Sequence, residues 1–358
     1  MYRIPYYLTG HTSKGFINLL SEQTLIGIER ICVLDHVSKT VKTSVLHACL
    51  ESVADSEHEV LLSPDGKEYL EGVIIRDHSL AILTNTIADS ANLPTKLLGK
   101  LIRIELDVHF AENEPDAAEV RLLEGVCNKA YDALLAGLRI HDDLESVYGD
   151  EMDFEKADEV AETITDLLLG KVSDRQKEPQ IERRMFGTNT PDGIVNIVPE
   201  IINRTSRIHF VHGRAGTGKS TLMKRIANTC LEKGLNLELY HCSFDPQSVD
   251  MIRVPELDYA IFDATDPHAF NPDPNDSGQE VIDTYELFVN PGTDEKYADI
   301  IEGVTRRYKK KAGEGIEWLK EAGKIMERLE EPYKTEEYTS LLQEECPKIA
   351  GVLVEEEY

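Results

Sequence analysis

The sequence lacks the cysteine pattern, the apolar runs and the leader that mark secreted and membrane proteins. Its six cysteines are scattered over 358 residues without a C-x-x-C pair, so we expect reduced thiols and neither a disulfide framework nor a zinc site. No stretch is long and apolar enough to span a bilayer, and the first residues, MYRIPYYLTG, do not follow the charged-then-apolar pattern of a signal peptide. These absences predict a cytoplasmic protein with no membrane partner.

Basic residues are also scarce. The chain has 38 Lys and Arg residues against 66 Asp and Glu residues, a formal net charge of −28. Nucleic-acid affinity comes largely from neutralising phosphates, so this balance argues against a nucleic-acid partner. A hydrophobic content of 41% allows a substantial core, and the length suits two modest domains.

One segment matches a phosphate-binding motif. Residues 213–220 read GRAGTGKS and are followed by Thr221, which fits the pattern G-x-x-x-x-G-K-[ST]. The apolar run 208–211 precedes the motif and predicts a buried strand, and apolar residues at helical spacing follow it. The predicted order of strand, glycine-rich loop and helix is the context that this motif requires.

The residue types in the motif suit a triphosphate. Glycines allow successive N–H groups to point inward as an anion nest at a helix N-terminus, where the helix dipole also favours negative charge. The lysine is expected to reach the β- and γ-phosphates. The residues expected to bind the nucleotide are Gly213, Arg214, Ala215, Gly216, Thr217, Gly218, Lys219, Ser220 and Thr221.

A magnesium ion would need oxygen ligands beside this loop. The Ser220 hydroxyl is one expected ligand, and Asp263, at the end of the apolar run 259–262, stands where a Walker B aspartate lies. Alternatively, Asp263 is a turn residue that ends a strand. Ala264 follows where many motor ATPases carry a catalytic glutamate, which argues against vigorous ATP hydrolysis. No N-K-x-D guanine motif occurs, so ATP is the expected nucleotide.

The chain also contains a degenerate copy of the motif. Residues 30–44 align without gaps under 207–221, at an offset of 207 − 30 = 177. His36, Lys39 and Val41 replace the three glycines, and Thr84 stands in place of Asp263. Since side chains at these positions resist positive φ and crowd the phosphate path, we expect the first repeat to keep its scaffold without binding nucleotide. Lys42 is expected to be a solvated surface lysine.

The repeats define the expected organisation. We predict two tandem P-loop NTPase-like α/β repeats, each with a parallel sheet and a helical segment. A basic group, residues 306–311, precedes a break expected at Gly313 and Gly315; it is either a lid over the γ-phosphate or a solvated helix end. The expected segments are 1–110 (degenerate repeat), 111–170 (helical), 171–184 (linker), 185–290 (intact repeat), 291–345 (helical, a possible lid) and 346–358 (C-terminal tail).

Two further segments carry a family resemblance. Residues 241–250 read HCSFDPQSVD and residues 263–268 read DATDPH. With the loop, they resemble the signatures of a bacterial family of tandem P-loop ATPase-like, nucleotide-kinase-like proteins. The resemblance implies ATP binding with hydrolysis or phosphoryl transfer and specifies no substrate. Both repeats commonly keep the loop in that family, and the first repeat of this chain departs from it.

The two signatures contain further polar candidates. Asp245 either orients a substrate hydroxyl, as a third catalytic candidate beside Lys219 and Asp263, or forms an Asp-Pro turn. Asp250 either caps a turn or binds the water shell of the metal. His268 either contacts phosphate or is structural.

These observations lead to one main function and two rivals. The main expectation is an Mg-ATP-binding protein, a slow ATPase or small-molecule kinase that acts through the second repeat only. The first alternative is a nucleotide-dependent switch or scaffold for a protein partner, and the second is a fully decayed structural protein. The sequence leaves the small-molecule substrate or protein partner unidentified.

Overall fold

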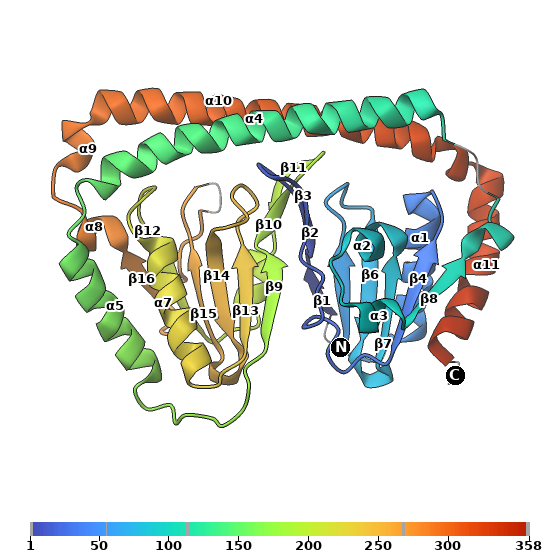
Figure 1. Ribbon diagram of the computed structural model, residues 1–358, viewed down its shortest axis with the longest axis horizontal. Helices are drawn as coiled ribbons and strands as arrows, with labels where there is room; N and C mark the ends of the chain where they lie inside the picture. Colours follow the sequence, from blue (N-terminus) through green and yellow to red (C-terminus); the bar gives the residue numbers. More distant parts are fainter. Residues whose placement is uncertain (1–2, 55, 112–114, 267–268, 356–358) are drawn as a thin grey trace.

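Two similar α/β halves lie side by side beneath a pair of long helices in the computed structural model, which describes residues 3–54, 56–111, 115–266 and 269–355 (Figure 1). Each half contains a six-stranded sheet, and a four-stranded sheet lies between them. In the first half the strands are β1 (Arg3–Tyr6), β2 (Thr9–Thr12), β3 (Gly15–Asn18), β4 (Arg30–Asp35), β5 (His58–Leu62), β6 (Leu70–Ile75), β7 (Leu80–Thr84) and β8 (Leu101–Glu105). In the second half they are β9 (Ile181–Met185), β10 (Gly187–Thr190), β11 (Gly193–Asn196), β12 (Arg207–His212), β13 (Leu237–His241), β14 (Val249–Val254), β15 (Tyr259–Asp263) and β16 (Gln279–Asp283).

The helices follow the same repeat. The α-helices of the first half are α1 (Lys39–Ser52), α2 (Asn85–Ser90), α3 (Thr95–Leu98), α4 (Ala117–Gly149) and α5 (Phe154–Leu169). Those of the second half are α6 (Val198–Ile202), α7 (Lys219–Glu232), α8 (Thr284–Phe288), α9 (Thr293–Lys296), α10 (Ala298–Glu330) and α11 (Glu336–Glu355). Four short 3₁₀ turns complete the described elements: η1 (Arg76–His78), η2 (Leu106–Val108), η3 (Pro255–Leu257) and η4 (Glu331–Tyr333).

The two large sheets have the same strand order. The first runs β1-β5-β6-β7-β4-β8, and the second runs β9-β13-β14-β15-β12-β16 when read in the same direction. Ser79 and Asp258, at the same place in the two halves, are the non-glycine residues with positive φ in the described chain, at 48° and 47°. The structure therefore contains an internal repeat of mixed α/β architecture.

The sheets are not purely parallel, contrary to expectation. β6 and β14 each run antiparallel to both of their neighbours, while the other pairs in these two sheets are parallel. Each follows the preceding strand after a short loop, and antiparallel strands need no long crossover. Both are almost fully buried, so their apolar runs did not distinguish them from parallel strands.

The helical segments are exchanged between the halves. α4 and α10, 33 residues each, pack against one another in opposite directions above the sheets (Figure 1). Beyond this pair, α5 of the first half packs on α7 of the second, and α11 of the second half packs on α1 of the first. Each α/β unit is therefore covered by helices that belong to the other repeat.

Three boundaries differ from the sequence prediction. α10 is continuous through Gly313 and Gly315, so these glycines do not break the helix. A Cβ at Gly315 would lie 2.7 Å from Leu134 Cγ, and glycine at this position therefore permits close contact with α4. The expected linker, 171–184, overlaps strand β9, and most of the expected C-terminal tail continues helix α11.

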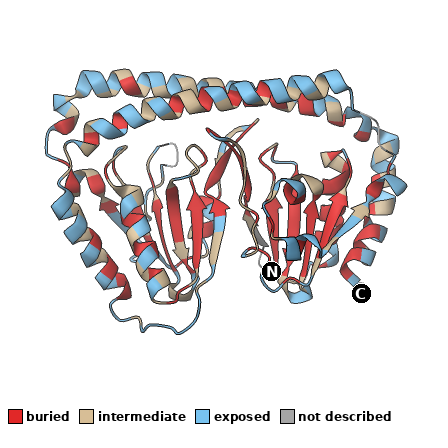
Figure 2. Ribbon diagram, in the orientation of Figure 1, coloured by how far each residue is buried: buried red, intermediate tan, exposed pale blue. Residues whose placement is uncertain are grey.

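The core joins the repeats. The strands of both large sheets are mostly buried (Figure 2). One cluster includes Tyr6 and Leu25 of the first repeat together with Phe186, Phe210 and Phe262 of the second. The ring centroids of Phe210 and Phe262 are 4.9 Å apart, and truncation of such a buried aromatic residue costs about 3–5 kcal/mol. This shared packing couples the stability of the two repeats.

Candidate functional site

The 213–218 loop connects β12 to α7 and has the backbone conformation that its glycines allow. Gly213, Gly216 and Gly218 have φ values of 154°, 72° and 82°. A Cβ at Gly213 would lie 2.1 Å from Thr284 Oγ1, and one at Gly216 would lie 2.4 Å from the Glu145 carbonyl oxygen. Both the conformation and the surrounding atoms therefore require glycine at these positions.

Hydrogen bonds from two buried threonine hydroxyl groups stabilise this loop. Thr217, which is 1% exposed, donates from Oγ1 to the Arg214 carbonyl at 2.8 Å and accepts from the Arg214 N–H at 3.2 Å. Its Oγ1 also lies 2.7 Å from that of Thr284, which donates to the His212 carbonyl at 3.0 Å. These contacts hold the loop against α8. Thr221, which lies in the first turn of α7, is exposed.

Lys219 lies between the loop and the neighbouring strand. As the first residue of α7 it donates from Nζ to the Arg214 carbonyl at 2.6 Å, and its Nζ lies 3.6 Å from Asp263 Oδ2. β12 and β15 are parallel neighbours in which Val211 pairs with Asp263, so the carboxylate lies beside the start of the loop. The structure therefore places the Lys219 ammonium group beside the Asp263 carboxylate.

The residues expected to hold magnesium have suitable oxygen atoms. Ser220 Oγ is buried and has no hydrogen-bond partner among the described residues. Asp263 Oδ1 accepts from the Thr265 N–H at 3.0 Å. This contact is also typical of a turn residue that ends a strand, which is the alternative role of Asp263. A hydroxyl and a carboxylate are hard ligands that suit Mg²⁺ when water and phosphate complete its shell. In the described part of the chain, no group of three or more His, Cys, Asp or Glu side chains could hold a metal.

Asp245 and Asp250 occupy different environments. Asp245 Oδ1 accepts from the Gln247 N–H at 3.2 Å, as in an Asp-Pro turn, and lies 3.4 Å from Lys14 Nζ of the first repeat. Asp250 is buried, and the loss of solvent, followed by the negative charge of Asp263, raises its pKa to about 7. Asp250 lies within β14, beside the strand that carries Asp263, so it does not cap a turn. His268 lies outside the described residues.

Helix α4 contributes residues that the motif analysis missed. Glu145 lies against Gly216, and Met152, just past the helix end, lies against Gly218. His141 contacts Tyr308 of α10 at a ring-centroid distance of 5.2 Å. Burial lowers the pKa of His141, while Glu145 opposes this shift. No local pattern marks these residues, because α4 reaches the loop only through the exchange of helices.

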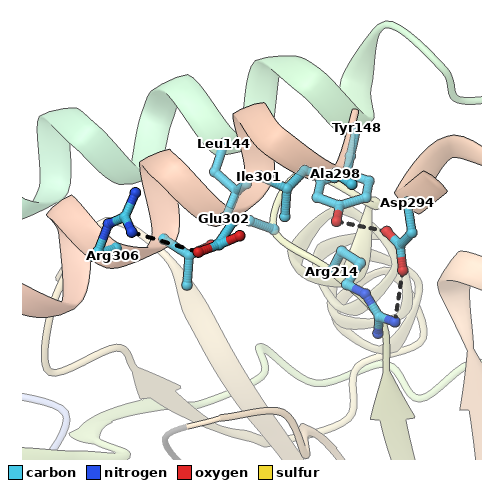
Figure 3. A pocket seen from close by; sticks show the side chains of 10 residues that line it. Leu144, Tyr148, Arg214, Asp294, Ala298, Ile301, Glu302 and Arg306 are labelled. Carbon is cyan, nitrogen blue, oxygen red and sulfur yellow. Dashed lines mark hydrogen bonds and ion pairs between the residues drawn. The ribbon is translucent and has the colours of Figure 1, made fainter. Parts of the chain in front are cut away.

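A pocket of about 550 Å³ opens beside the loop (Figure 3). Arg214 and Ala215 of the loop form part of its wall, and the remainder comes from the end of α4 and from the Asp294–Arg306 region. Asp294 accepts hydrogen bonds from the Tyr148 hydroxyl at 2.8 Å and from Arg214 at 3.0 Å (Figure 3). This ion pair fixes one side of the pocket to the loop.

The basic group 306–311 is mainly engaged with nearby carboxylates. Arg306 pairs with Glu302 at 3.5 Å, Lys311 with Glu314 at 2.6 Å, and Lys309 with Asp266 at 2.7 Å. The last pair connects α10 to the loop after β15. The group lies within a continuous helix, so a helix-end dipole effect does not explain its position.

The corresponding loop in the first repeat is shorter as well as poor in glycine. Residues 36–38 join β4 to α1, whereas residues 213–218 join β12 to α7. The alignment without gaps nevertheless holds through the helix, because the buried Val45, Leu46 and Cys49 fall on the buried Leu222, Met223 and Ile226. α1 therefore begins about one turn before the position that aligns with Lys219. Lys42 is 3% exposed and donates to Asn85 Oδ1 at 2.6 Å. The expectation of a solvated lysine is wrong, and burial, followed by the charge of Lys39, lowers its pKa to about 8.

A carboxylate covers the N-terminus of α1 in this first repeat. Glu330, the last residue of α10 and 5% exposed, accepts from Ser38 Oγ at 2.6 Å, from the Lys39 N–H at 2.8 Å and from the Thr40 N–H at 3.0 Å. The last residue of α4, at the intact loop, is Gly149, which has no side chain. An internal carboxylate thus takes the place in the first repeat where a helix N-terminus would otherwise hold an anion.

Comparisons with known proteins found no match. No family model, no curated protein and no solved structure matches this chain. Within the described residues, none of the helices combines the length and the apolar character needed to cross a membrane.

Proposed function

We propose that the second repeat binds Mg-ATP on residues 213–221 and that the protein is a slow ATPase or small-molecule kinase. In this proposal both repeats are P-loop NTPase-like, and only the second is active. The observation that carries the proposal is the loop itself, in which three glycines with positive φ lead into the N-terminus of α7. A bent, glycine-rich backbone at a helix N-terminus is suited to binding phosphate oxygens.

Each side chain at the loop has a role in this proposal. Lys219 exchanges the Arg214 carbonyl for the β- and γ-phosphate oxygens, a charge-assisted interaction stronger than the one it replaces. Ser220 and Asp263 would hold the magnesium ion, which would neutralise charge on the phosphates. Asp250, a buried carboxyl group on the neighbouring strand β14, is our candidate to take a proton from the attacking hydroxyl.

The switch or scaffold remains the second candidate. Ala264 carries no acid after Asp263, and α4 and α10 each extend over both repeats. Nucleotide binding at the loop would then order these helices for a partner without turnover.

Calorimetric titration of the full chain with Mg-ATP tests the shared part of both candidates. Lys219→Ala should weaken binding at least about tenfold, the effect of losing one charged hydrogen bond. Lys224→Ala, an exposed lysine on the same helix, is the matched control and should leave binding unchanged. Phosphate release that is lost in Lys219→Ala would favour the enzyme, and tight binding without release would favour the switch. No binding by the wild-type chain would contradict both.

A further inference from the structure

We propose that the pocket between α4 and α10 binds the adenine base of the nucleotide whose phosphates lie on the 213–221 loop. This inference rests on the proposed function and extends it, because phosphate binding alone does not select a base. The pocket and the loop are continuous, since Arg214 and Ala215 belong to both. A volume of about 550 Å³ lies within the usual range for small-molecule sites.

The composition of the pocket suits a flat, uncharged ring. Leu144, Ala298 and Ile301 supply apolar surface, and Tyr148, which is largely buried, also lines the pocket. The two acids that line the pocket are already paired, Asp294 with Arg214 and Tyr148, and Glu302 with Arg306 (Figure 3). An apolar surface beside charged groups that are already paired favours a base over a second phosphate or another anion.

The sheet order separates this pocket from the carboxyl groups needed for chemistry. β12 lies between β16 and β15 in the sheet. The pocket residues Asp294–Arg306 follow β16 and α8 in the chain, whereas Asp263 ends β15 and Asp250 lies on the next strand, β14. A nucleotide whose base lies on the β16 side would direct its terminal phosphate toward the β15 side, where Lys219 and Asp263 meet.

This arrangement gives both repeats a part in the site. Leu144 and Tyr148 belong to α4 of the first repeat, and Ala298 and Ile301 belong to α10 of the second. Glu330 fixes the far end of α10 on the first repeat. The base pocket therefore depends on the exchanged helices, although the phosphate loop belongs to the second repeat alone.

The test compares ATP with inorganic tripolyphosphate, which carries the phosphates without a base. Ala298→Trp and Thr305→Trp place a large ring at two positions of the pocket wall, and Ile300→Trp, at a 51% exposed position outside the wall, is the matched control. By calorimetry with Mg²⁺, both pocket variants should bind ATP about tenfold or more weakly than the wild type, which corresponds to about 1.4 kcal/mol. Their tripolyphosphate affinity and the ATP affinity of Ile300→Trp should stay unchanged.

The outcomes distinguish this inference from the function beneath it. Unchanged ATP affinity in both pocket variants, together with loss of ATP and tripolyphosphate binding in Lys219→Ala, would overturn the base pocket and leave the phosphate site in place. Equal loss of ATP and tripolyphosphate binding in the pocket variants would also overturn it, because the substitutions would then act on the loop. No binding of either ligand by the wild type would overturn the proposed function itself.

Discussion

Replacing Glu330 tests the internal carboxylate at the degenerate loop. The side chain is 5% exposed and accepts three hydrogen bonds, at 2.6, 2.8 and 3.0 Å. Hydrogen bonds to charged groups contribute about 1.5–3 kcal/mol each, and burial of the carboxylate opposes this by several kcal/mol. Since Glu330→Ala removes the charge and leaves two amide groups without their partner, we expect a loss of about 3 kcal/mol in the free energy of unfolding.

Urea denaturation measures this loss, with two comparison variants. Glu330→Gln keeps the shape and one acceptor oxygen, so it should cost less than Glu330→Ala. Glu327→Ala, an exposed glutamate on the same helix, should change stability by less than about 0.5 kcal/mol. A loss in Glu330→Ala no larger than in Glu327→Ala would refute the reasoning.

Inorganic phosphate provides a second readout of the same position. In a Lys219→Ala background, which weakens the intact loop, phosphate should stabilise Glu330→Ala more than the chain that retains Glu330. The freed N–H groups and the dipole of α1 would then accept an external anion. Equal stabilisation of both chains would show that Glu330 does not occupy an anion position.

Three further predictions concern packing and pH. Gly216→Ala should weaken ATP binding and lower the melting temperature, because its Cβ would clash with the backbone of α4; an unchanged melting temperature would contradict this packing. Gly315→Val should destabilise the α4–α10 contact by about 1–3 kcal/mol, whereas Gly313→Ala, whose Cβ meets no atom within 4 Å, should be neutral or stabilising in urea denaturation; equal effects would argue against the contact. Burial raises the pKa of Glu71 to about 8, so between pH 4.5 and pH 8 the folded state binds a proton that the unfolded state has lost. The free energy of unfolding of the wild type should therefore fall, relative to that of Glu71→Gln, by on the order of 3 kcal/mol between pH 5 and 7.5. Parallel pH profiles of stability for the two chains would contradict the shift.

Local sequence patterns were sufficient for the parts of the fold that depend on neighbouring residues. The 213–218 loop lies between a strand and a helix because glycine spacing and apolar runs act over a few residues. The alignment of 30–35 with 207–212 also matches equivalent strands, β4 and β12. It also holds for the buried face of the following helix, and only the helix start differs, because α1 begins three residues before the position that aligns with Lys219.

Long-range features were not predictable from the sequence. The contacts of Glu145 with the intact loop and of Glu330 with α1 depend on helices that cross to the other repeat. A glutamate at the end of an acidic amphipathic helix resembles any solvated glutamate until its tertiary partner is known. Lys42 was misjudged for the same reason, because its contact with Asn85, 43 residues away in the chain, depends on the fold.

The stoichiometry of ATP binding to the full chain tests the central claim most directly. Calorimetry with Mg-ATP should give one site per chain for the wild type and for Glu330→Gln, and a binding constant at least about tenfold weaker for Lys219→Ala. Two sites per chain, no binding, or unchanged affinity in Lys219→Ala would contradict the account of one active repeat and one internally occupied repeat.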